Sequence, residues 1–302
     1  MAEGSTAGIP AGLPAAVGFV GLGRMGAPMV RRLAAAGVAV RGHDAIARAD
    51  LADVATLVGS APQAAEGVRV VILMLPDSTA VDAVVHGAGL LDALAPGTVL
   101  VDMGSSEPLR TRALAEEVAT RGAVLVDAPV SGGVGGATAG TLTVMAGGPD
   151  DAVAGLLPLL AVLGRVRHVG PVGAGHALKA LNNLMSAAHL LASSEALLAG
   201  QRFGLDPAAM LEAVNGSSGR SGSTQNKWPD FVLPGTFDSG FALALMVKDI
   251  RIALGLVEAT GTPSALAART VELWSEAANA LGPDADHTEI VRWLQAADAP
   301  GG

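Results

Sequence analysis

The sequence predicts an α/β protein with two parts, an N-terminal doubly wound parallel sheet followed by an all-α C-terminal domain. From Ala16 to about Val169, short β-branched runs alternate with Ala-rich segments of helical periodicity, which is the pattern of βαβ units. Beyond Gly170 this alternation stops, and apolar residues recur at helical spacing. Half of the residues are hydrophobic but only 3% are aromatic, so Ala, Val and Leu must fill the core, as suits helices packed on a parallel sheet.

The change of pattern falls in the Gly-rich stretch 170–175 and sets the predicted domain boundaries. A chain of 302 residues is long enough for two domains. We expect a sheet domain over residues 15–173 and a helical domain over residues 174–302. Residues 1–14 are rich in Gly, Ala and Pro and lack the basic residues of a signal peptide, so we expect a flexible tail there.

The expected strands are short apolar runs at residues 17–20, 38–43, 68–75, 99–103, 124–127, 142–146 and 166–169. In the second half of the chain, Pro207 and Pro263 are expected at helix starts, and Gly204 and Gly261 at helix ends. The Ser- and Gly-rich stretch 215–223 is expected to form a loop.

Composition excludes several classes of function. The net charge is −9 without any basic cluster, so we expect no nucleic-acid partner and no anionic membrane surface. The chain has no Cys, which excludes thiolate nucleophiles and Cys-ligated zinc, and no Tyr, which excludes dehydrogenases with a tyrosine proton donor. The uncharged apolar stretch 152–164 is too short to span a bilayer. We therefore expect a soluble, cytoplasmic protein.

A glycine motif follows the first predicted strand and opens the next helix, with Asp44 about 20 residues further on. Its residues are Gly21, Leu22, Gly23, Arg24, Met25 and Gly26. We assign the tight turn to Gly21, the close approach of a pyrophosphate to Gly23, and the close packing of helix on strand to Gly26. The motif therefore predicts a Rossmann-type dinucleotide-binding domain.

The acidic residue after the second strand indicates which dinucleotide binds. Asp44 is expected to accept hydrogen bonds from the adenosine ribose and to repel a 2′-phosphate, which favours NAD. NADP stays possible, because Arg41 and Arg48 are close enough in sequence to meet a phosphate.

A second Gly-rich turn, Ser131-Gly132-Gly133, follows another predicted strand. Backbone N–H groups unobstructed by Cβ atoms, together with the Ser131 hydroxyl, predict a site for a substrate carboxylate. The alternative is a flexible loop that only joins two strands.

Lys179, Asn182, Asn183 and Ser186 fall at i, i+3, i+4 and i+7 of an otherwise apolar helix and so share one face. A lysine aligned with two amides is a candidate acid/base group with its orienting residues; the alternative is a solvated helix face. The six histidines offer another base, but none has a metal-ligand spacing or an obvious neighbouring carboxylate. We expect them to be structural or exposed, and we expect no metal site.

Four segments together resemble the β-hydroxyacid dehydrogenase family, which includes 3-hydroxyisobutyrate dehydrogenase and tartronate semialdehyde reductases and has a 6-phosphogluconate dehydrogenase-like fold. They are residues 18–29 (GFVGLGRMGAPM), 127–148 (DAPVSGGVGGATAGTLTVMAGG), 173–183 (GAGHALKALNN) and 248–249 (KD). The resemblance spans nearly the whole chain in the family's order. It implies an NAD(P)-dependent oxidoreductase that interconverts a small 3-hydroxy acid and its semialdehyde.

The same resemblance implies roles for individual residues. Ser131, Gly132 and Gly133 are expected to bind the substrate carboxylate, Lys179 to be the catalytic acid/base, and Asn183 to position the substrate. Lys248 is expected at the nicotinamide end of the cofactor with Asp249 supporting it, although the pair is also typical of a surface ion pair. Leu75 and Pro76 are expected to line the cofactor cleft, and Phe241 is a candidate wall of the substrate pocket.

One segment departs from the family pattern. Where the family has Asp-x-Ser-Thr, this chain has Asp102-Met103-Gly104-Ser105, so a hydroxyl is kept at Ser105 and lost at Gly104. This puts in doubt the detailed contacts around the nicotinamide. The alternatives to a hydroxyacid dehydrogenase are an imine reductase and a non-catalytic dinucleotide-binding module. The apolar helical domain also predicts a homodimer or a higher homo-oligomer.

Overall fold

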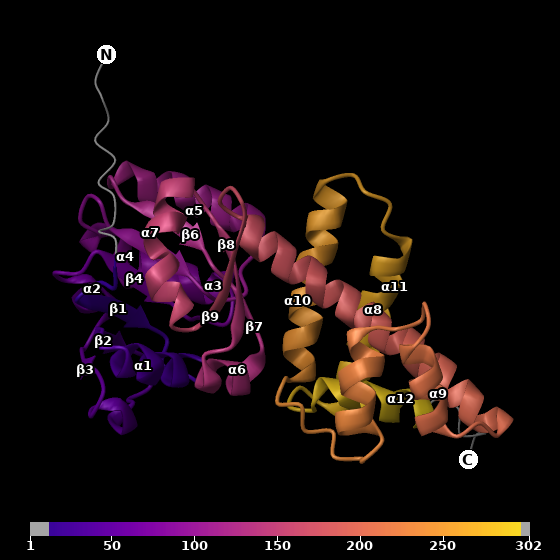
Figure 1. Ribbon diagram of the computed structural model, residues 1–302. Coiled ribbons are helices and arrows are strands. Elements are labelled where there is room, and N and C mark those ends of the chain that lie inside the picture. The colour runs from indigo at the N-terminus through magenta and orange to yellow at the C-terminus, as the bar shows by residue number, and fades with distance from the viewer. Residues whose placement is uncertain (1–11, 297–302) are drawn as a thin grey trace. The chain divides into compact units, whose positions relative to one another are not determined.

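The computed structural model describes residues 12–296 of the chain (Figure 1). The chain divides into two compact units between Lys179 and Ala180, and each unit is described by itself. Of the predicted flexible tail over residues 1–14, residues 1–11 lie outside the described residues. The domain boundaries at 14/15 and 173/174 stay predictions.

The first unit is built on a nine-stranded sheet whose strands follow the order β3-β2-β1-β4-β5-β6-β8-β7, with β9 paired to β8. Pairing is parallel from β3 through β6, in the 3-2-1-4-5-6 order of dinucleotide-binding folds. The strands are β1 (Ala16–Val20), β2 (Ala39–His43), β3 (Thr56–Leu57), β4 (Val70–Leu73), β5 (Val99–Asp102), β6 (Val124–Asp127), β7 (Val130–Ser131), β8 (Leu142–Gly147) and β9 (Gly164–Gly170).

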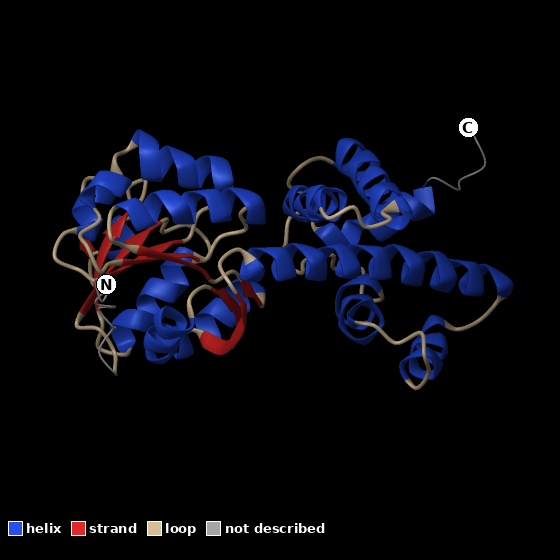
Figure 2. Ribbon diagram, turned by 90° about the horizontal axis from the view of Figure 1, so that it is seen from above, coloured by secondary structure: helices blue, strands red, loops and turns tan. Residues whose placement is uncertain are grey.

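Helices cover both faces of this sheet (Figure 2). On one face α1 (Gly26–Ala35), α6 (Gly133–Ala139) and α7 (Asp150–Ala161) bury their apolar side chains against the strands. On the other face lie α2 (Ala61–Ala65), α3 (Ser78–Asp82), the π-helical turn η2 (Ala83–Gly87), α4 (Leu90–Ala93) and α5 (Pro108–Thr120). The central strands β4 and β5 are buried along their whole length, as expected for strands covered on both sides.

The second unit is helical and begins within α8 (Ala174–Phe203), a helix of 30 residues. The helices that follow are α9 (Pro207–Asn215), the π-helical segment η3 (Ser223–Val232), α10 (Leu243–Ala259), α11 (Ala265–Leu281), the 3-10 turn η4 (His287–Glu289) and α12 (Ile290–Ala296). The core of this unit contains two fully buried aromatic residues, Trp228 and Trp274. Within residues 12–296, no helix combines the length and the apolar character needed to cross a membrane.

The predicted fold class is confirmed, and all seven expected strands occur, β6 with the expected bounds and the other six with shifted ends. Strands β3 and β7 were missed because two residues are too few to show a periodicity. Within this parallel sheet β8 is an exception, because it pairs antiparallel with β6 and β7. Only residues 132–141 connect β7 to β8, whereas a parallel crossover needs a dozen residues or more.

Three of the four residues that were expected to start or end helices do so. Pro207 is the first residue of α9, and Gly204 and Gly261 follow α8 and α10 with positive φ. Pro263 lies ahead of α11, which begins at Ala265, so it precedes the helix and does not start it.

Candidate active site

The glycine motif forms the turn between β1 and α1, and its three glycines serve different purposes. Gly21 has φ +95° and donates its N–H to the His43 carbonyl at 2.9 Å. A Cβ at Gly21 would lie 2.3 Å from the Met74 oxygen, and one at Gly26 would lie 1.9 Å from the Gly21 oxygen. At Gly23 an added Cβ would meet nothing within 4 Å. Gly21 and Gly26 are therefore required by the fold, while Gly23 leaves open space beside the start of a helix, which fits a bound pyrophosphate.

Asp44 directly follows β2 and ties that strand end to the glycine loop. One carboxylate oxygen accepts the Leu22 N–H at 2.6 Å, and the other accepts the Ile46 N–H at 2.8 Å. A carboxylate has about four lone-pair sites, so these two bonds leave room for ribose hydroxyls. Within the motif, Arg24 is exposed and Met25 is partly buried.

The two arginines considered for a 2′-phosphate are engaged elsewhere. Arg41 donates to the Gln63 carbonyl at 2.8 and 3.1 Å and also contacts Glu66. Arg48 forms a bidentate pair with Asp50 at 2.8 and 2.9 Å. A 2′-phosphate would compete with these partners for the two guanidinium groups.

The loops after β4 and β5 pack directly against each other, which explains the departure from the family pattern at Gly104. A Cβ at Gly104 would lie 2.4 Å from the Leu75 oxygen, so this backbone leaves no room for a side chain. Asp102 fixes the loop by accepting the Gly104 N–H at 2.9 Å and the Ser106 hydroxyl at 2.7 Å. Ser105 is partly buried between these two contacts.

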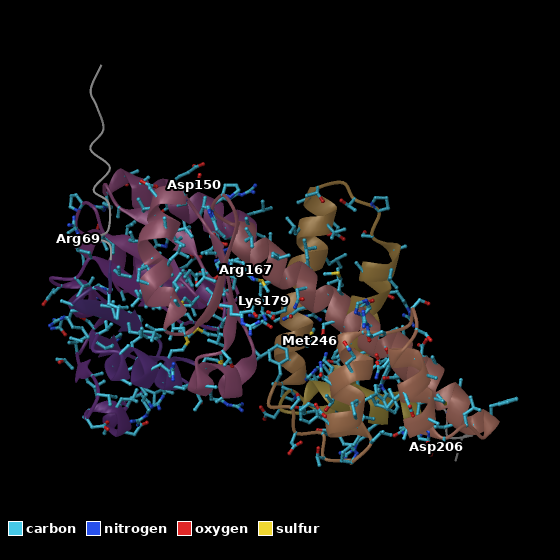
Figure 3. All side chains as sticks on the ribbon, viewed as in Figure 1. Arg69, Asp150, Arg167, Lys179, Asp206 and Met246 are labelled. Atoms are coloured by element: carbon cyan, nitrogen blue, oxygen red, sulfur yellow. The ribbon has the colours of Figure 1, made fainter. Side chains whose placement is uncertain are left out.

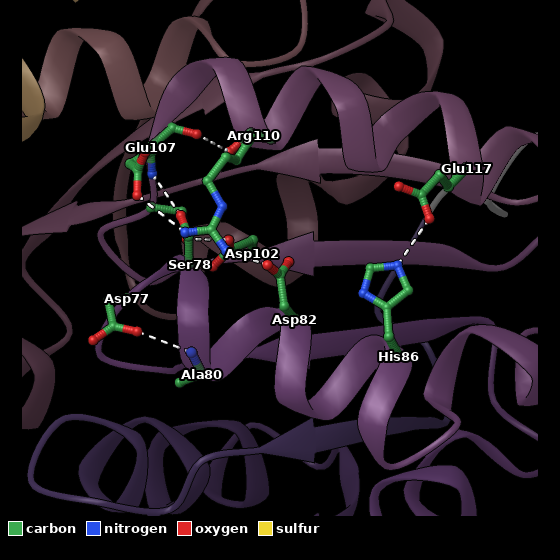
Figure 4. A network of polar contacts seen from close by, with 11 residues as sticks. Asp77, Ser78, Ala80, Asp82, His86, Asp102, Glu107, Arg110 and Glu117 are labelled. Carbon is green, nitrogen blue, oxygen red and sulfur yellow. Dashed lines mark hydrogen bonds and ion pairs between the residues drawn. The ribbon is translucent and has the colours of Figure 1, made fainter. Parts of the chain in front are cut away.

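A polar network next to these loops holds the start of α5 to α3 (Figure 4). The Glu107 N–H donates to the Ser78 hydroxyl at 2.8 Å, and Arg110 pairs with both Asp82 and Glu107. Asp77 caps α3 by accepting the Ala80 N–H at 2.9 Å. The loops that carry Leu75, Pro76 and Ser105 are therefore anchored at both ends.

The predicted carboxylate clamp lies where β7 turns into α6. Ser131 pairs with Thr143 across the antiparallel ladder and is partly exposed. Gly132 and Gly133 have φ of +129° and +61°, values that favour glycine, and a Cβ on Gly133 would meet nothing within 4 Å. The turn thus has its shape from glycine and leaves open space beside Gly133.

The start of α8 is held by a buried carboxylate. Asp127, at the end of β6, accepts the Gly173 N–H at 2.6 Å and the His176 N–H at 2.8 Å. Burial raises the pKa of the Asp127 carboxyl above its usual range. Since Lys179 lies on the next turn of α8, Asp127 positions the helix that carries the predicted acid/base group (Figure 3).

The expectation that no histidine lies beside a carboxylate was wrong. The ring of His176 lies 3.7 Å from Asp102 and 3.8 Å from Asp127, and its Nδ1 is 2.8 Å from the Thr111 hydroxyl. His86 and His287 also contact carboxylates, those of Glu117 and Asp286. These partners come from distant parts of the sequence, so spacing could not reveal them. Among residues 12–296, no group of three His, Cys, Asp or Glu side chains could hold a metal ion.

The polar face of α8 is buried at Lys179 and Asn183 and partly buried at Asn182 and Ser186, so the alternative of a solvated face is wrong for its two main residues. Lys179 is 9% exposed and Asn183 is 6% exposed. In the helical unit, Asn183 donates to a carboxylate oxygen of Asp249 at 2.6 Å, and the other oxygen is 3.1 Å from the Lys248 ammonium. Because Asp249 is buried, Lys248 and Asp249 are not an ordinary surface pair.

Lys227 was missed by sequence reasoning. Its ammonium group donates to the Ser186 hydroxyl at 2.8 Å, so it reaches the same face of α8. Burial lowers the pKa of Lys227 to about 8. A signal was present in the composition, because only Lys179, Lys227 and Lys248 among the 19 Lys and Arg residues are lysines.

A glycine turn after the first strand, an acidic residue after the second and the 3-2-1-4-5-6 strand order define a dinucleotide-binding oxidoreductase of the Rossmann type. Residues 16–173 match the NAD-binding domain of 6-phosphogluconate dehydrogenase, and residues 173–294 match the NAD-binding family model of NADP-dependent 3-hydroxyisobutyrate dehydrogenase. The chain belongs to the 3-hydroxyisobutyrate dehydrogenase-like family of β-hydroxyacid dehydrogenases, NAD(P)-dependent enzymes that act on CH–OH donors.

Similar proteins cover nearly the whole chain. The 2-(hydroxymethyl)glutarate dehydrogenase of Eubacterium barkeri is 38% identical over 88% of this chain and 90% of its own length. A 3-hydroxyisobutyrate dehydrogenase of Pseudomonas aeruginosa is 39% identical over 90% of this chain and 94% of its own. The structure of Mycobacterium tuberculosis 3-hydroxyisobutyrate dehydrogenase with L-serine has a TM-score of 0.87 at 31% identity, covering 94% of this chain and 100% of that one.

Proposed function

We propose that this enzyme interconverts a small 3-hydroxy acid of the 3-hydroxyisobutyrate type and its semialdehyde by hydride transfer, with Lys179 as general acid and base. The observation that carries the proposal is the buried pair on α8, in which Lys179 lies one turn before Asn183. The Asn183 amide is in turn held by Asp249. Such an arrangement supports a proton-transfer group beside a fixed orienting amide.

The glycine turn and the neighbouring loops are proposed to hold the dinucleotide, whose nicotinamide accepts or supplies the hydride when bound. Asp44 is proposed to bind the adenosine ribose, which favours NAD, and the existing partners of Arg41 and Arg48 support this preference over NADP. The remaining contacts are assigned to Gly21, Leu22, Gly23, Arg24, Met25, Gly26, Leu75, Pro76, Ser105 and Lys248.

The substrate carboxylate is proposed to bind at Ser131, Gly132 and Gly133, with Asn183 positioning the reacting end. In reduction, the Lys179 ammonium gives a proton to the carbonyl oxygen, so that no unpaired alkoxide accumulates. In oxidation, the Lys179 amine takes the proton of the substrate hydroxyl.

The names of the relatives indicate which part of the substrate varies. 3-Hydroxyisobutyrate, L-serine and 2-(hydroxymethyl)glutarate each carry a CH2OH group on the carbon that bears a carboxylate, and they differ in the third substituent of that carbon. We propose that this enzyme also binds the carboxylate and oxidises the CH2OH group that these compounds share. Family membership weighs against the alternatives of an imine reductase and a non-catalytic module.

The test is a spectrophotometric assay of NAD and NADP reduction with a panel of 3-hydroxy acids, run on wild type and on Lys179→Ala. We expect turnover by the wild type and its loss in the variant, with dinucleotide affinity unchanged in a fluorescence titration. Turnover near the wild-type rate in Lys179→Ala would remove Lys179 from the mechanism. A cytoplasmic location and a homodimer or higher homo-oligomer remain part of the proposal, and light scattering tests the latter.

A further inference from the structure

The use of lysine in this chain is restricted to three positions. Sixteen of its 19 basic residues are arginines, which serve the exposed ion pairs, such as Arg269 with Glu272 and Arg121 with Asp92. The proposed function uses Lys179 and Lys248. The third lysine, Lys227, has no assigned role.

Lys227 lies on η3, a π-helical segment of the kind that occurs often at functional sites. Its ammonium group is 2.8 Å from the Ser186 hydroxyl, and Ser186 is the next polar position after Asn183 on the same face of α8. The amine is therefore about one helical turn beyond the amide that is proposed to position the substrate.

The ammonium group lacks a full set of partners. It carries three N–H donors, and within residues 12–296 Ser186 is its one hydrogen-bond partner. The opposing charge that acts on Lys227 is that of Asp286, whose carboxylate already accepts the Ser239 hydroxyl, the Gly240 N–H and both donors of Thr288. A cation that is partly removed from water and has donors available is stabilised by an incoming anion.

We propose that Lys227, with Ser186, binds a second carboxylate of the substrate, so that the enzyme prefers 3-hydroxy acids that are dicarboxylates. This inference rests on the proposed function, because it extends the same site along α8. Lys179 and Ser186 are separated by seven residues, or about 10 Å along the helix axis. In 2-(hydroxymethyl)glutarate four carbons separate the hydroxyl oxygen, which Lys179 is proposed to contact, from the distal carboxylate, and with a hydrogen bond of about 2.8 Å at each end this part of the molecule spans a comparable length.

The site also has the electrostatic response that an anion needs. The groups that act on Lys227 are Asp286, which favours its charge, and His287, whose pKa is lowered by burial and by the Lys227 charge. Binding a carboxylate favours the ammonium form of Lys227. Affinity for a dicarboxylate therefore falls as the pH rises past about 8, while affinity for a monocarboxylate does not.

The test compares 2-(hydroxymethyl)glutarate with 4-carbamoyl-2-(hydroxymethyl)butanoate, in which the distal carboxylate is replaced by a neutral amide of the same shape. For wild type we expect kcat/KM to be about ten- to a hundredfold higher for the dicarboxylate, mostly through KM. Lys227→Met lowers kcat/KM more for the dicarboxylate than for the amide, so that the preference is lost, whereas Lys227→Arg keeps part of it. Equal kcat/KM values for the two compounds in wild type would overturn the proposal.

A binding measurement separates this inference from the proposed function. Calorimetry of glutarate and of its monoamide is carried out on wild type and Lys227→Met in the presence of NAD, with no turnover required. Tighter binding of glutarate to wild type alone supports the subsite even if no 3-hydroxy acid is oxidised, which would reject only the proposed function. Equal binding of both ligands by both proteins rejects the subsite even if 3-hydroxyisobutyrate is a good substrate.

Discussion

The two units of this enzyme contribute different kinds of structural feature to the candidate site. In the sheet unit, which ends at Lys179, most of the important features are backbone features, namely the turns at Gly21 and Gly133, the open space beside Gly23 and the close contact of Gly104 with Leu75. In the helical unit the important features are buried polar side chains, as in the contact of Asn183 with Asp249.

The two units therefore contribute different properties to the site: the backbone turns give it its shape, and the side chains give it its chemical selectivity. Backbone turns present N–H groups and space to any dinucleotide, whereas side chains such as Lys227 distinguish one substrate from another. Substitutions in the glycine turns should therefore change folding and cofactor affinity, and substitutions on the buried polar face should change rate and substrate choice. Four substitutions test this contrast.

The largest effect is expected at Lys179. Loss of a general acid/base group reduces kcat by about 10²- to 10⁴-fold, and we expect this for Lys179→Ala with unchanged NAD affinity. The matched control is Leu178→Ala, because Leu178 is the preceding residue and is 38% exposed. A similar loss in both variants would show that the helix, and not the amine, was damaged.

Gly26→Ala is expected to act through folding. Its Cβ would lie 1.9 Å from the Gly21 oxygen, so α1 must move, at a cost of about 3 kcal/mol of unfolding free energy. Gly23→Ala is the control, because its Cβ meets nothing in the protein and only obstructs a ligand. Thermal unfolding should show a lower Tm for Gly26→Ala alone, while both variants bind NAD less tightly. An equal loss of Tm in both would contradict the distinction.

Asp127→Asn should change how stability depends on pH. Burial raises the pKa of Asp127 in the folded protein, so the folded state binds more protons than the unfolded state, and wild type loses stability as the pH rises through that interval. The variant lacks this loss but holds the Gly173 and His176 amides less well, at a cost of about 1 to 2 kcal/mol at low pH. Urea unfolding at several pH values should show that the difference in unfolding free energy between wild type and Asp127→Asn becomes smaller as the pH rises. A difference that does not change with pH would contradict this prediction.

Lys227→Met is expected to have the smallest effect of the four substitutions, and it should raise the stability of the unliganded protein instead of lowering it. The pKa of Lys227 is lowered to about 8 by burial, so its charge costs stability at pH 7 that is recovered as the pH rises toward the unfolded value. Removing the charge should stabilise the unliganded protein by about 1 kcal/mol at pH 7, because partial contact with water reduces the full penalty. Lys227→Arg, which keeps a charge, should give no gain. A lower Tm for Lys227→Met would show that its Ser186 contact outweighs the burial cost.

Much of the fold could be predicted because its signals are local. Strand runs, helix-end glycines and the glycine motif each lie within a few residues, and their physical reasons act over the same distance. The direction of β8 was not predictable from its own residues, since it depends on the length of the connection from β7. The loss of a hydroxyl at Gly104 had no explanation in sequence because the obstructing Leu75 oxygen belongs to another loop.

Residues of the candidate site were predictable where one helix or one loop contains them. Lys179 and Asn183 share a helix, so their common face followed from spacing. The contacts of His176 with Asp102 and of Lys227 with Ser186 join residues 74 and 41 positions apart, and no periodic pattern reports them. Composition was the better guide to Lys227, because lysine is rare in this chain while arginine is common.

The scarcity of lysine has a practical consequence. Reagents that acylate or reductively alkylate amines do not react with guanidinium groups, so they do not label the arginines of the exposed ion pairs. The chain's three side-chain amines are the acid/base candidate, the cofactor-end candidate and the dicarboxylate-binding candidate. Peptide mapping after such labelling, with and without ligands, would therefore report almost entirely on the functional residues of this enzyme.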